Sequence, residues 1–434
     1  MNSLWNCIED IPKYPSLKHD TKTDVLIIGG GAAGLLTAYL LKEKGIESII
    51  IEKGRICQGT TGYSTAKITF QHSLIYDKIL KSSGIDTARG YLNAGRLAFS
   101  KYAELCQVID CDYEIKDNYI YSLYDRRCLE KEMNALLTIG YDAVFKENLP
   151  LPFKTMGAVC FPHQAQFHPL KFFYELSKSL KIYENTFARA YKDGVVITDN
   201  GKIQAKNIIV TTHFPFVNNH GLYSLKLYQH RSYVVALENA QNVNGMYLDE
   251  NDKGLSFRNY GNLLLIGGGS HRTGNEGGGW TELRSFSKKH YPEAKERYFW
   301  AAQDCMSIDS IPYIGKYSKK THNLYTATGF NKWGFTSSML GAILLSDELH
   351  GSKNEYSEIF SPSRNMLKPQ LIVNSFESAK NLLTFSKKRC PHLGCALKWN
   401  KAEHSWDCPC HGSRFDEKGT LLNGPSNGDL KTER

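Results

Sequence analysis

A glycine-rich turn between an apolar strand and an amphipathic helix constrains the fold of this chain more than any other feature. An apolar run from Asp24 to Ile28 enters the turn at residues 29–34, and residues 32–44 then repeat apolar side chains at helical spacing. A second strand is predicted over residues 47–52, after the helix stops at Gly45. Strand, turn, helix and strand within about 30 residues predict a βαβ unit with a right-handed crossover.

The turn itself, GGGAAG, fits the pattern G-x-G-x-x-G of a dinucleotide-binding site. Gly29 would permit the tight turn, Gly31 would let the backbone approach a pyrophosphate, and Gly34 would let the helix pack on the strand. Glu52 ends the second strand, where a carboxylate can accept hydrogen bonds from a ribose diol. The alternative is a purely structural turn. A second candidate, residues 267–272, has Arg272 at the third glycine position, so one dinucleotide site is expected.

Composition excludes several function classes. A length of 434 residues suits about three domains. The net charge of +9 is dispersed, and the longest basic run is Lys387-Lys388-Arg389, so no nucleic-acid partner is expected. The apolar stretch from Val25 to Leu41 is interrupted by four glycines, which predicts no membrane span. The first 15 residues lack the pattern of a secretory signal, so a cytoplasmic location is expected.

Periodicity predicts further elements along the chain. Helices are expected at residues 75–109, 126–140 and 333–350, and strands at residues 113–124, 194–212 (a hairpin), 230–237, 254–260, 262–267 and 323–328. A long glycine-rich loop is expected from Gly267 to Trp280. The strands of the central region indicate a second, mostly antiparallel sheet. A linker is expected at Ser361–Lys368, followed by a short, partly helical connection over residues 371–388.

Four of the eleven cysteines lie within 21 positions near the C-terminus. Two short segments there, Cys390-Pro-His392 and Cys408-Pro-Cys410-His411, each offer one thiolate and one imidazole. A Rieske [2Fe–2S] centre needs two thiolates on one iron and two imidazoles on the other. Cys390, His392, Cys408 and His411 are therefore the predicted metal ligands. A structural zinc ion, which two cysteines and two histidines also suit, is the alternative.

The chain resembles the D-amino-acid oxidase and glycine oxidase superfamily of FAD-dependent oxidoreductases, in the branch that carries a C-terminal Rieske domain. Five stretches carry the resemblance: residues 24–34, 59–69 (GTTGYSTAKIT), 208–215 (IIVTTHFP), 311–315 (IPYIG) and 328–334 (TGFNKWG). The resemblance implies bound FAD. It implies FAD contacts at Thr60, Thr61, Thr65, Ala66, Lys67, Ala188, Gly329 and Gly334, in addition to the residues of the turn and Glu52. A helix that begins at Gly334 would face the flavin pyrimidine and stabilise negative charge there.

The resemblance to Rieske loops extends to Gly412, Ser413 and Phe415. It implies a disulfide between the two remaining loop cysteines, Cys395 and Cys410. The C-terminal unit is abbreviated, because such modules usually place several strands before the first ligand loop. Since imidazole ligation raises the cluster potential, electrons are expected to run from reduced flavin to the cluster.

The implied architecture is an α/β FAD-binding domain, an α+β substrate domain with an antiparallel sheet, and a small all-β Rieske module. The expected ranges are 20–110, 152–215 and 301–360 for FAD binding, 111–151 and 216–300 for the substrate domain, 361–385 for the linker and 386–434 for the module. The superfamily oxidises C–N bonds, so an amine-like substrate and an unidentified electron acceptor are implied. Arg258 and Arg272 are candidates for holding a substrate carboxylate. An electron-transfer or redox-sensing protein without substrate turnover, and an oxidase that uses O₂, are the alternatives.

Overall fold

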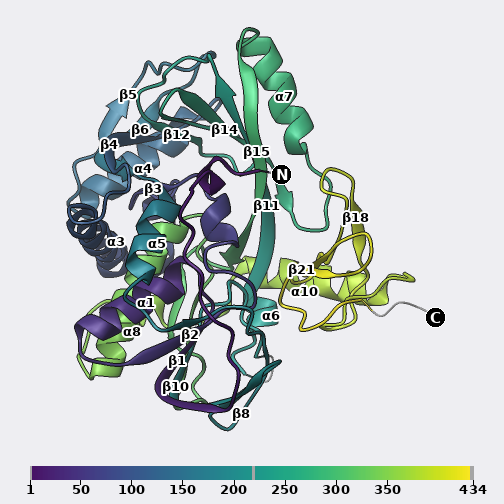
Figure 1. Cartoon of the computed structure of the whole chain (residues 1–434). Coiled ribbons are helices and arrows are strands. Elements are labelled where there is room, and N and C mark those ends of the chain that lie inside the picture. The colour runs from purple at the N-terminus through teal and green to yellow at the C-terminus, as the bar shows by residue number, and fades with distance from the viewer. Residues whose placement is uncertain (1, 218–219, 431–434) are drawn as a thin grey trace.

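The computed structural model describes residues 2–217 and 220–430 and contains three β-sheets (Figure 1). An eight-stranded sheet occupies the lower part of the molecule in this view, and a nine-stranded sheet occupies the upper part. A four-stranded sheet near the C-terminus lies to one side of both. The predicted fold class, an α/β domain with an antiparallel second sheet and a small all-β C-terminal unit, is confirmed.

The eight-stranded sheet is built on the βαβ unit that the glycine turn predicts. Strand β1 (Thr21–Ile28) pairs in parallel with β2 (Ser48–Ile51) and with β10 (Gly201–Val210), and helix α1 (Ala32–Glu43) makes the crossover. The remaining strands are β7 (Ile182–Tyr183), β8 (Ala188–Lys192), β9 (Val195–Thr198), β16 (Tyr313–Lys316) and β17 (Leu324–Thr328). The inner half of β1 is buried on both faces, as expected for a parallel sheet covered by helices.

The nine-stranded sheet is antiparallel except where β12 runs parallel to β4. Its strands, in the order in which they lie, are β15 (Lys295–Ser307), β11 (Leu227–Glu238), β14 (Leu263–Arg272), β13 (Ser256–Tyr260), β12 (Met246–Asp249), β4 (Glu114–Tyr121), β6 (Ala158–Gln166) and β3 (Lys67–Ile68), with β5 (Val144–Lys146) paired to β6. Strands β3 and β6 thus join this sheet from ranges expected in the FAD-binding part. The chain therefore passes from one large sheet to the other several times.

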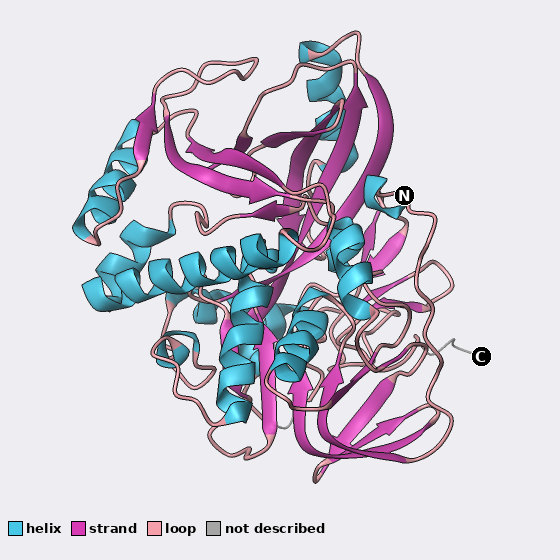
Figure 2. Cartoon of the chain, turned by 60° about the vertical axis from the view of Figure 1, so that its left-hand side comes forward, coloured by secondary structure: helices cyan, strands magenta, loops and turns pink. Residues whose placement is uncertain are grey.

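Further helices are α2 (Ile75–Ser83), α3 (Ile85–Cys106), α4 (Arg126–Thr138), α5 (Pro169–Ser177), α6 (Tyr223–Lys226), α7 (Gly279–His290), α8 (Gly334–His350), α9 (Ser357–Phe360) and α10 (Pro369–Leu383), with short 3₁₀ helices η1 (Leu4–Asn6) and η2 (Thr60–Tyr63). Figure 2 shows several helices lying close together in the middle of the molecule, whereas α7 and α10 lie on the opposite side from α3 and α4 (Figure 1). Helix α8 packs against both α1 and α3. These contacts belong to the main apolar core of the molecule.

Two local predictions are corrected. The single helix expected at residues 75–109 is two helices, because Gly84 at φ +84° separates α2 from α3. The loop expected from Gly267 to Trp280 is shorter: β14 continues through the glycines to Arg272, and α7 begins at Gly279. A Cβ at Gly267 would lie 2.5 Å from Ser256 Oγ, so this glycine serves close packing within the sheet. Helix α10 lies largely within residues 371–388, where the sequence predicts a partly helical connection.

The C-terminal sheet consists of β18 (Lys398–Asn400), β19 (Ser405–Asp407), β20 (Arg414–Phe415) and β21 (Leu421–Asn423).

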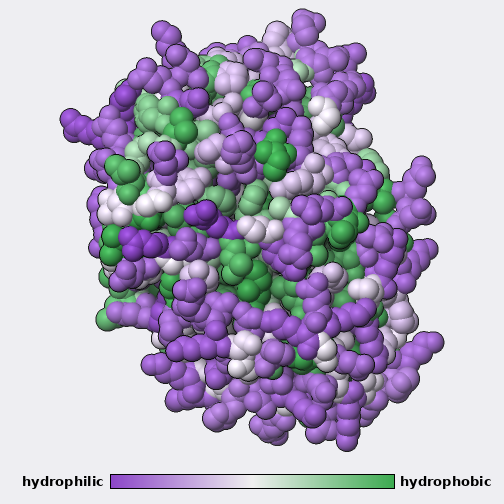
Figure 3. Space-filling view, turned by 90° about the vertical axis from the view of Figure 1, so that its left-hand side faces the viewer, coloured by the Kyte–Doolittle hydropathy of each residue, from purple (hydrophilic) through white to green (hydrophobic). Residues whose placement is uncertain are grey.

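Polar side chains cover most of the face shown in Figure 3, with hydrophobic side chains gathered across its middle. Among residues 2–217 and 220–430, no helix has the length and apolar character needed to cross a bilayer.

Candidate functional site

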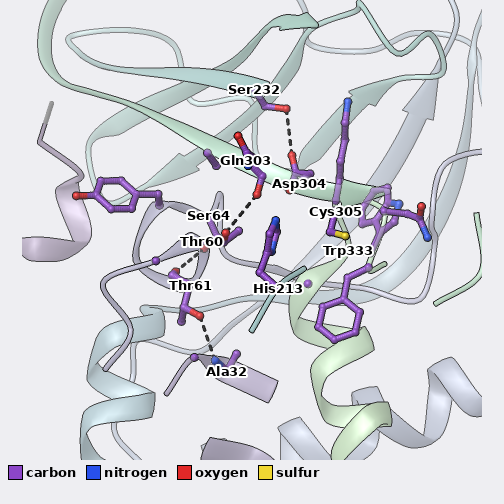
Figure 4. A pocket seen from close by; sticks show the side chains of 18 of the residues that line it. Ala32, Thr60, Thr61, Ser64, His213, Ser232, Gln303, Asp304, Cys305 and Trp333 are labelled. Atoms are coloured by element: carbon purple, nitrogen blue, oxygen red, sulfur yellow. Dashed lines mark hydrogen bonds between the residues drawn. The ribbon is translucent and has the colours of Figure 1, made fainter. Parts of the chain in front are cut away.

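A cavity of about 750 Å³ lies between the two large sheets. Its walls come from the glycine turn, η2, strands β11, β14 and β15, and the first turn of α8 (Figure 4). This volume is within the range of sites that bury cofactors and small molecules. Each residue that the resemblance assigns to FAD binding therefore lies either on the wall of this cavity or away from it.

The glycine turn has the geometry that a pyrophosphate site requires. Gly29 adopts φ +117°, and a Cβ there would lie 2.7 Å from the backbone oxygen of Thr211. A Cβ on Gly34 would lie 1.9 Å from the oxygen of Gly29, so this glycine lets α1 approach the turn and stands behind the wall. Gly31 is the N-cap residue of α1 and makes no side-chain capping hydrogen bond. The first N–H groups of α1 thus border the cavity.

Glu52 lies at the end of β2 and lines the cavity. Its Oε2 accepts a hydrogen bond from the N–H of Gly30 at 2.9 Å, and its Oε1 accepts one from the N–H of Gly54 at 3.0 Å. These two bonds hold the carboxylate beside the turn. Ala188, the first residue of β8, lines the same end of the cavity. This end therefore offers a fixed acceptor for a ribose and a small side chain beside it.

The segment from Thr60 to Lys67 follows the cavity wall from the glycine turn toward the nine-stranded sheet, and Thr60, Thr61, Thr65, Ala66 and Lys67 all line it. Thr61 Oγ1 accepts a hydrogen bond from the N–H of Ala32 at 3.1 Å, which ties η2 to α1 (Figure 4). Thr60 Oγ1 donates to the backbone oxygen of Gln303 at 3.2 Å, which ties η2 to β15. These bonds position the segment between both sheets.

Lys67 is a cation on the wall of this cavity. Its Nζ donates to the backbone oxygen of Tyr247 at 3.3 Å. Burial, with the guanidinium of Arg258 acting in the same direction, lowers the pKa of Lys67 to about 7. An anionic ligand group beside Nζ would oppose both effects.

Helix α8 brings a second helix N-terminus to the cavity. Gly334 is its first residue and lines the wall. The N-cap residue, Trp333, makes no side-chain capping hydrogen bond. A Cβ on Gly334 would meet no atom within 4 Å, so the space in front of the helix is open. Gly329 lies outside the wall: it adopts φ +71°, and a Cβ there would lie 3.0 Å from Leu227 Cδ2. Its place is in the turn between β17 and α8.

Together these features fit FAD. One cavity is lined by the turn and Glu52 and also by Lys67 and Gly334, and the N-termini of α1 and α8 both border it. Helix N-termini favour negative charge, both on a pyrophosphate and on a reduced flavin. Sequence reasoning missed one part of the wall, residues 422–427 of the C-terminal region, which border the same cavity.

The two candidate substrate arginines do not line this cavity in the described part of the chain. Arg258 is fully buried behind Lys67, donates from Nη1 to Gln166 Oε1 at 2.6 Å, and packs over the Trp5 ring. Arg272 donates from Nη1 to Asn374 Oδ1 at 3.0 Å, so it holds β14 to α10. Lys67 is one of the cationic residues that do line the cavity.

The cavity also contains ionisable groups that the sequence did not indicate. Asp304 accepts a hydrogen bond from Ser232 Oγ at 3.2 Å, and burial raises the pKa of its carboxyl against the charges of Lys332 and His213. Burial lowers the pKa of His213, whose Nε2 lies 3.0 Å from Gln229 Oε1. Figure 4 shows His213 pointing into the space between Thr60 and Trp333. No motif marks these residues, because Ser232 and Asp304 come together through pairing of β11 with β15, and His213 reaches the cavity from the segment after β10.

The predicted metal ligands converge in the C-terminal region. The thiols of Cys390 and Cys408 are hydrogen-bonded to each other, and this bond lowers the pKa of Cys390 to about 7. The rings of His392 and His411 lie 5.0 Å apart between centroids and are nearly perpendicular. Burial lowers the pKa of His392 to about 4 and that of His411 to about 3, so both imidazoles are neutral near pH 7. Neutral imidazoles and a poised thiolate are the forms that bind metal.

His411 shows which of its nitrogens faces a metal. Its Nε2 donates to the backbone oxygen of Ser224 at 3.2 Å. Its Nδ1 is buried and has no hydrogen-bond partner among the described residues. A bond that fixes one ring nitrogen as the donor leaves the lone pair of the other available to a metal. The site therefore fits a metal centre that binds His411 through Nδ1.

Cys395 and Cys410 form a disulfide between the two ligand loops. The sulfurs of Cys395, Cys408 and Cys410 lie within 4.8 Å of one another, so the disulfide lies directly beside the ligand Cys408. The bridge uses two of the four cysteines and leaves two thiols and two imidazoles as the donor set. That set matches a Rieske cluster, in which each loop supplies one ligand of each kind.

The cavity and the metal site share residues. Phe214 lines the cavity, and its ring centroid lies 5.8 Å from that of His411 and 6.4 Å from that of His392. Gln303 also lines the cavity, and its Nε2 donates to the backbone oxygen of Gly412 at 2.8 Å. The residue after the ligand His411 is therefore bonded to the cavity wall.

Comparison with known proteins identifies the family. The model of the FAD dependent oxidoreductase family (DAO) matches residues 24–348, and that of the Rieske [2Fe-2S] domain matches residues 355–433. The chain belongs to the FAD-dependent oxidoreductases that carry a Rieske domain. The Bacillus subtilis protein that carries the name Rieske 2Fe-2S iron-sulfur protein YhfW is 34% identical over 492 aligned residues, which cover 99% of this chain and 97% of that protein. FAD and a [2Fe–2S] cluster are thus the cofactors that the family implies for this oxidoreductase.

Solved structures resemble the fold over about four fifths of the oxidoreductase. The L-proline dehydrogenase of P. horikoshii superposes with a TM-score of 0.67 at 16% identity, covering 81% of this chain and 98% of the other. The glycine oxidase of Geobacillus kaustophilus superposes with a TM-score of 0.67 at 19% identity, covering 80% of this chain and 99% of the other. At this level of identity the likeness concerns the fold alone.

Proposed function

We propose that this oxidoreductase oxidises an amine or amino-acid-like substrate in the cavity and that the electrons leave through the C-terminal cluster to an external acceptor. Bound FAD would supply hydride acceptance from a C–N bond, and the [2Fe–2S] cluster would supply one-electron transfer. Two proteins of the same fold, an L-proline dehydrogenase and a glycine oxidase by name, support an amino-acid-like substrate.

The observation that carries the proposal is the wall shared by the cavity and the cluster site. Phe214 contacts the rings of both histidine ligands from the cavity side. Gln303 bonds η2 through its backbone and the second ligand loop through its side chain. Phe214 follows β10 of the eight-stranded sheet, and Gln303 lies in β15 of the nine-stranded sheet. Because both large sheets contact the cluster loops, no separate docking step would be needed to bring the two redox sites together.

Lys67 is the residue we propose for the carboxylate of the substrate. It is held on the wall by Tyr247, and Arg258 behind it adds positive charge without reaching the cavity. A bound carboxylate would raise the pKa of Lys67 and so keep it protonated at neutral pH. Asp304 lies elsewhere on the same wall, where its carboxyl can accept a hydrogen bond from an amine.

Metal and flavin content are measured first, because two irons and one flavin per chain are the expected composition. Anaerobic addition of amino acids and simple amines to the holoprotein then tests the function. The expected result is flavin bleaching by at least one amino acid, followed by the electron paramagnetic resonance signal of a reduced Rieske cluster. Failure of every compound to bleach the flavin would favour an electron-transfer or redox-sensing protein without substrate turnover. Stoichiometric peroxide release without an added acceptor would contradict the proposed role of the cluster.

A pair of variants tests the role of Lys67. Lys67→Met should raise KM for an amino acid by about tenfold or more, because an interaction with a charged group contributes roughly 1.5–3 kcal/mol. Lys67→Arg, which keeps the charge, should retain most of the affinity. A substrate lacking the carboxylate should show the same KM with Lys67→Met as with the unsubstituted protein. Equal losses for both kinds of substrate would contradict carboxylate recognition by Lys67.

A further inference from the structure

Helix α10 presents its apolar side to solvent. Its buried residues are Asn374 and Asn381, whereas Phe376 is 67% exposed and Leu383 is 86% exposed. Ile372, Phe376 and Leu383 recur at spacings of four and seven residues, which places them on one stripe of the helix. The apolar ridge, as we term it, consists of the exposed residues Leu367, Ile372, Val373, Phe376, Leu382, Leu383 and Phe385. Seven exposed large apolar side chains in 19 positions form a concentrated apolar surface.

The polar side of α10 is anchored to the rest of the protein, which fixes the outward orientation of the ridge. Asn374 donates from Nδ2 to the backbone oxygen of Leu225 at 3.1 Å and accepts from Arg272. At the other end, the N–H of Ala396 donates to the backbone oxygen of Asn381 at 2.9 Å. Rotating the helix to bury its apolar side would break these bonds and place Asn374 and Asn381 in solvent.

Positive charge surrounds the ridge. Residues 367–389 contain five basic residues and one acidic residue. Lys380 and Lys387 are exposed, whereas the acidic residue, Glu377, lies 3.3 Å from the side chain of Asn381 on the anchored side. The segment thus combines exposed apolar side chains with exposed lysines, Lys380 and Lys387, for which no ion pair with another described residue is seen.

We propose that α10 and the segment after it, residues 367–389, form a docking surface for an anionic membrane. A helix whose apolar side chains face outward with lysines beside them can lie in the headgroup region, with the apolar side chains inserted and the lysines at the lipid phosphates. The charge argues against a second copy of the chain, because a two-fold contact would bring the basic segments of both copies together. Insertion into lipid also suits separate protruding side chains, which need no matching groove.

The position of the ridge gives the docking a consequence for the cluster. Arg389 donates from Nη1 to the backbone oxygens of Leu382 and Gly394, at 3.2 and 2.7 Å, so the end of α10 is tied to the first ligand loop. Leu393, next to the ligand His392, is 46% exposed in that loop. A docked helix would therefore hold the first ligand loop close to the membrane surface. The docking itself does not depend on the substrate of the oxidoreductase.

Co-sedimentation of the full-length holoprotein with vesicles tests the proposal. Vesicles of phosphatidylglycerol and phosphatidylcholine should bind the protein, whereas vesicles of phosphatidylcholine alone should bind it at least about tenfold more weakly, and high salt should reduce the difference. The double variant Phe376→Ser, Leu383→Ser should reduce the partition coefficient by at least about tenfold, because two apolar side chains no longer insert. Lys380→Glu with Lys387→Glu should abolish the preference for anionic lipid.

A matched control separates docking from general surface hydrophobicity. Val108 and Leu137, which are 80% and 71% exposed, lie after α3 and in α4, far from α10 (Figure 1). The double variant Val108→Ser, Leu137→Ser should bind vesicles as the unsubstituted protein does. Absence of vesicle binding by the holoprotein, or equal losses in both double variants, would overturn the proposal. Concentration-dependent dimerisation that only the ridge variant loses, without vesicle binding, would assign the ridge to a second copy and would also overturn it.

Discussion

The cavity region and the cluster region of this oxidoreductase are held together by different means. Around the cavity, one continuous core of aliphatic and aromatic side chains joins strands, helices and the first turn of α1. In the cluster region, the corresponding core contains Leu397 and Phe415, and its other buried members are the four cysteines of the ligand loops. Sulfur and charge thus take the place that apolar packing has elsewhere in the chain.

Buried ion pairs add to this contrast. Glu403 accepts hydrogen bonds from Arg231 of β11 and forms a 2.9 Å ion pair with Arg414 of β20. The side chain of Glu403 is 0% exposed, so the pair is fully withdrawn from water. A unit this small gains little from apolar burial and depends on cross-links, metal and contacts with a larger neighbour. Substitutions that unfold the cluster region should therefore leave the cavity region folded. Substitutions that unfold the cavity region should also destabilise the cluster region.

The largest expected effect is the loss of the cluster on substitution of one ligand. Cys408→Ser should remove both irons and the cluster absorbance while flavin content stays at one per chain, because the cavity wall does not use this thiol. Iron analysis and the visible spectrum measure both quantities. Cys160→Ser, at a buried free cysteine of β6, is the control and should retain iron. One zinc and no iron in the unsubstituted protein would contradict the Rieske assignment of these ligands.

The next effect concerns the ion pair between the two regions. Glu403→Gln should destabilise the cluster region by about 3 kcal/mol, because it leaves Arg231 and Arg414 buried with less compensation. Urea unfolding followed by cluster circular dichroism would show the loss at lower urea than flavin release. Glu238→Gln, which breaks an exposed pair with Arg297, should change neither transition appreciably. Parallel shifts of both transitions with Glu403→Gln would show that the regions unfold together.

Local patterns predicted the parts of the fold in which each residue depends on its sequence neighbours. The βαβ unit, α8 and strands β4, β11, β13 and β17 lie where alternation, helical spacing and glycine signals place them. The sequence does not predict what Gly84 and the glycines of β14 do, because the same residue type can end a helix or permit close packing of strands. What a glycine does depends on the atoms that surround it in the folded chain.

The site shows the same limit. Spacing alone indicated the cluster ligands, since each loop carries its cysteine and histidine close together. Arg258 and Arg272 are plausible by residue type, since guanidinium suits carboxylate, yet Arg258 lies behind the wall and Arg272 contacts α10. The ionisable wall residue Asp304 and the bridging residue Phe214 carry no local signal. They reach the cavity through pairing of β15 with β11 and through the end of β10, which are non-local contacts.

A smaller effect tests the packing of the glycine turn. Gly34→Ala should destabilise the cavity region by about 2–3 kcal/mol, because the added Cβ would lie 1.9 Å from the backbone oxygen of Gly29 and α1 would have to move away from β1. Flavin release should occur at lower urea, and cluster content before unfolding should be unchanged. Gly428→Ala is the control: a Cβ there meets no atom within 4 Å, and Gly428 is not part of the described cavity wall. Equal effects of the two substitutions would contradict the packing role of Gly34.

The smallest effect is a difference in pH dependence between two buried glutamates. Glu132 of α4 accepts hydrogen bonds from the N–H groups of Tyr76 and Asp77 at the start of α2, and burial raises the pKa of Glu132 to about 7 despite these bonds. Burial acts on Glu403 in the same direction, but Arg231 and Arg414 lower its pKa below the ordinary value.

The two shifts have opposite signs for stability. A carboxyl whose folded pKa is raised favours the folded state when protonated, so the stabilisation from Glu132 is present at pH 5 and is lost as the pH rises to about 7. The cavity region should lose about 2 kcal/mol of unfolding free energy between pH 5 and pH 8, measured by urea unfolding, and Glu132→Gln should remove that slope. The contribution of Glu403 is present throughout this range and is lost only below the ordinary glutamate pKa, so the cluster region should show no such slope. If the cluster transition instead shows a pH slope that Glu132→Gln abolishes, the cluster region depends on the cavity region for its stability. The two regions would then differ in composition only.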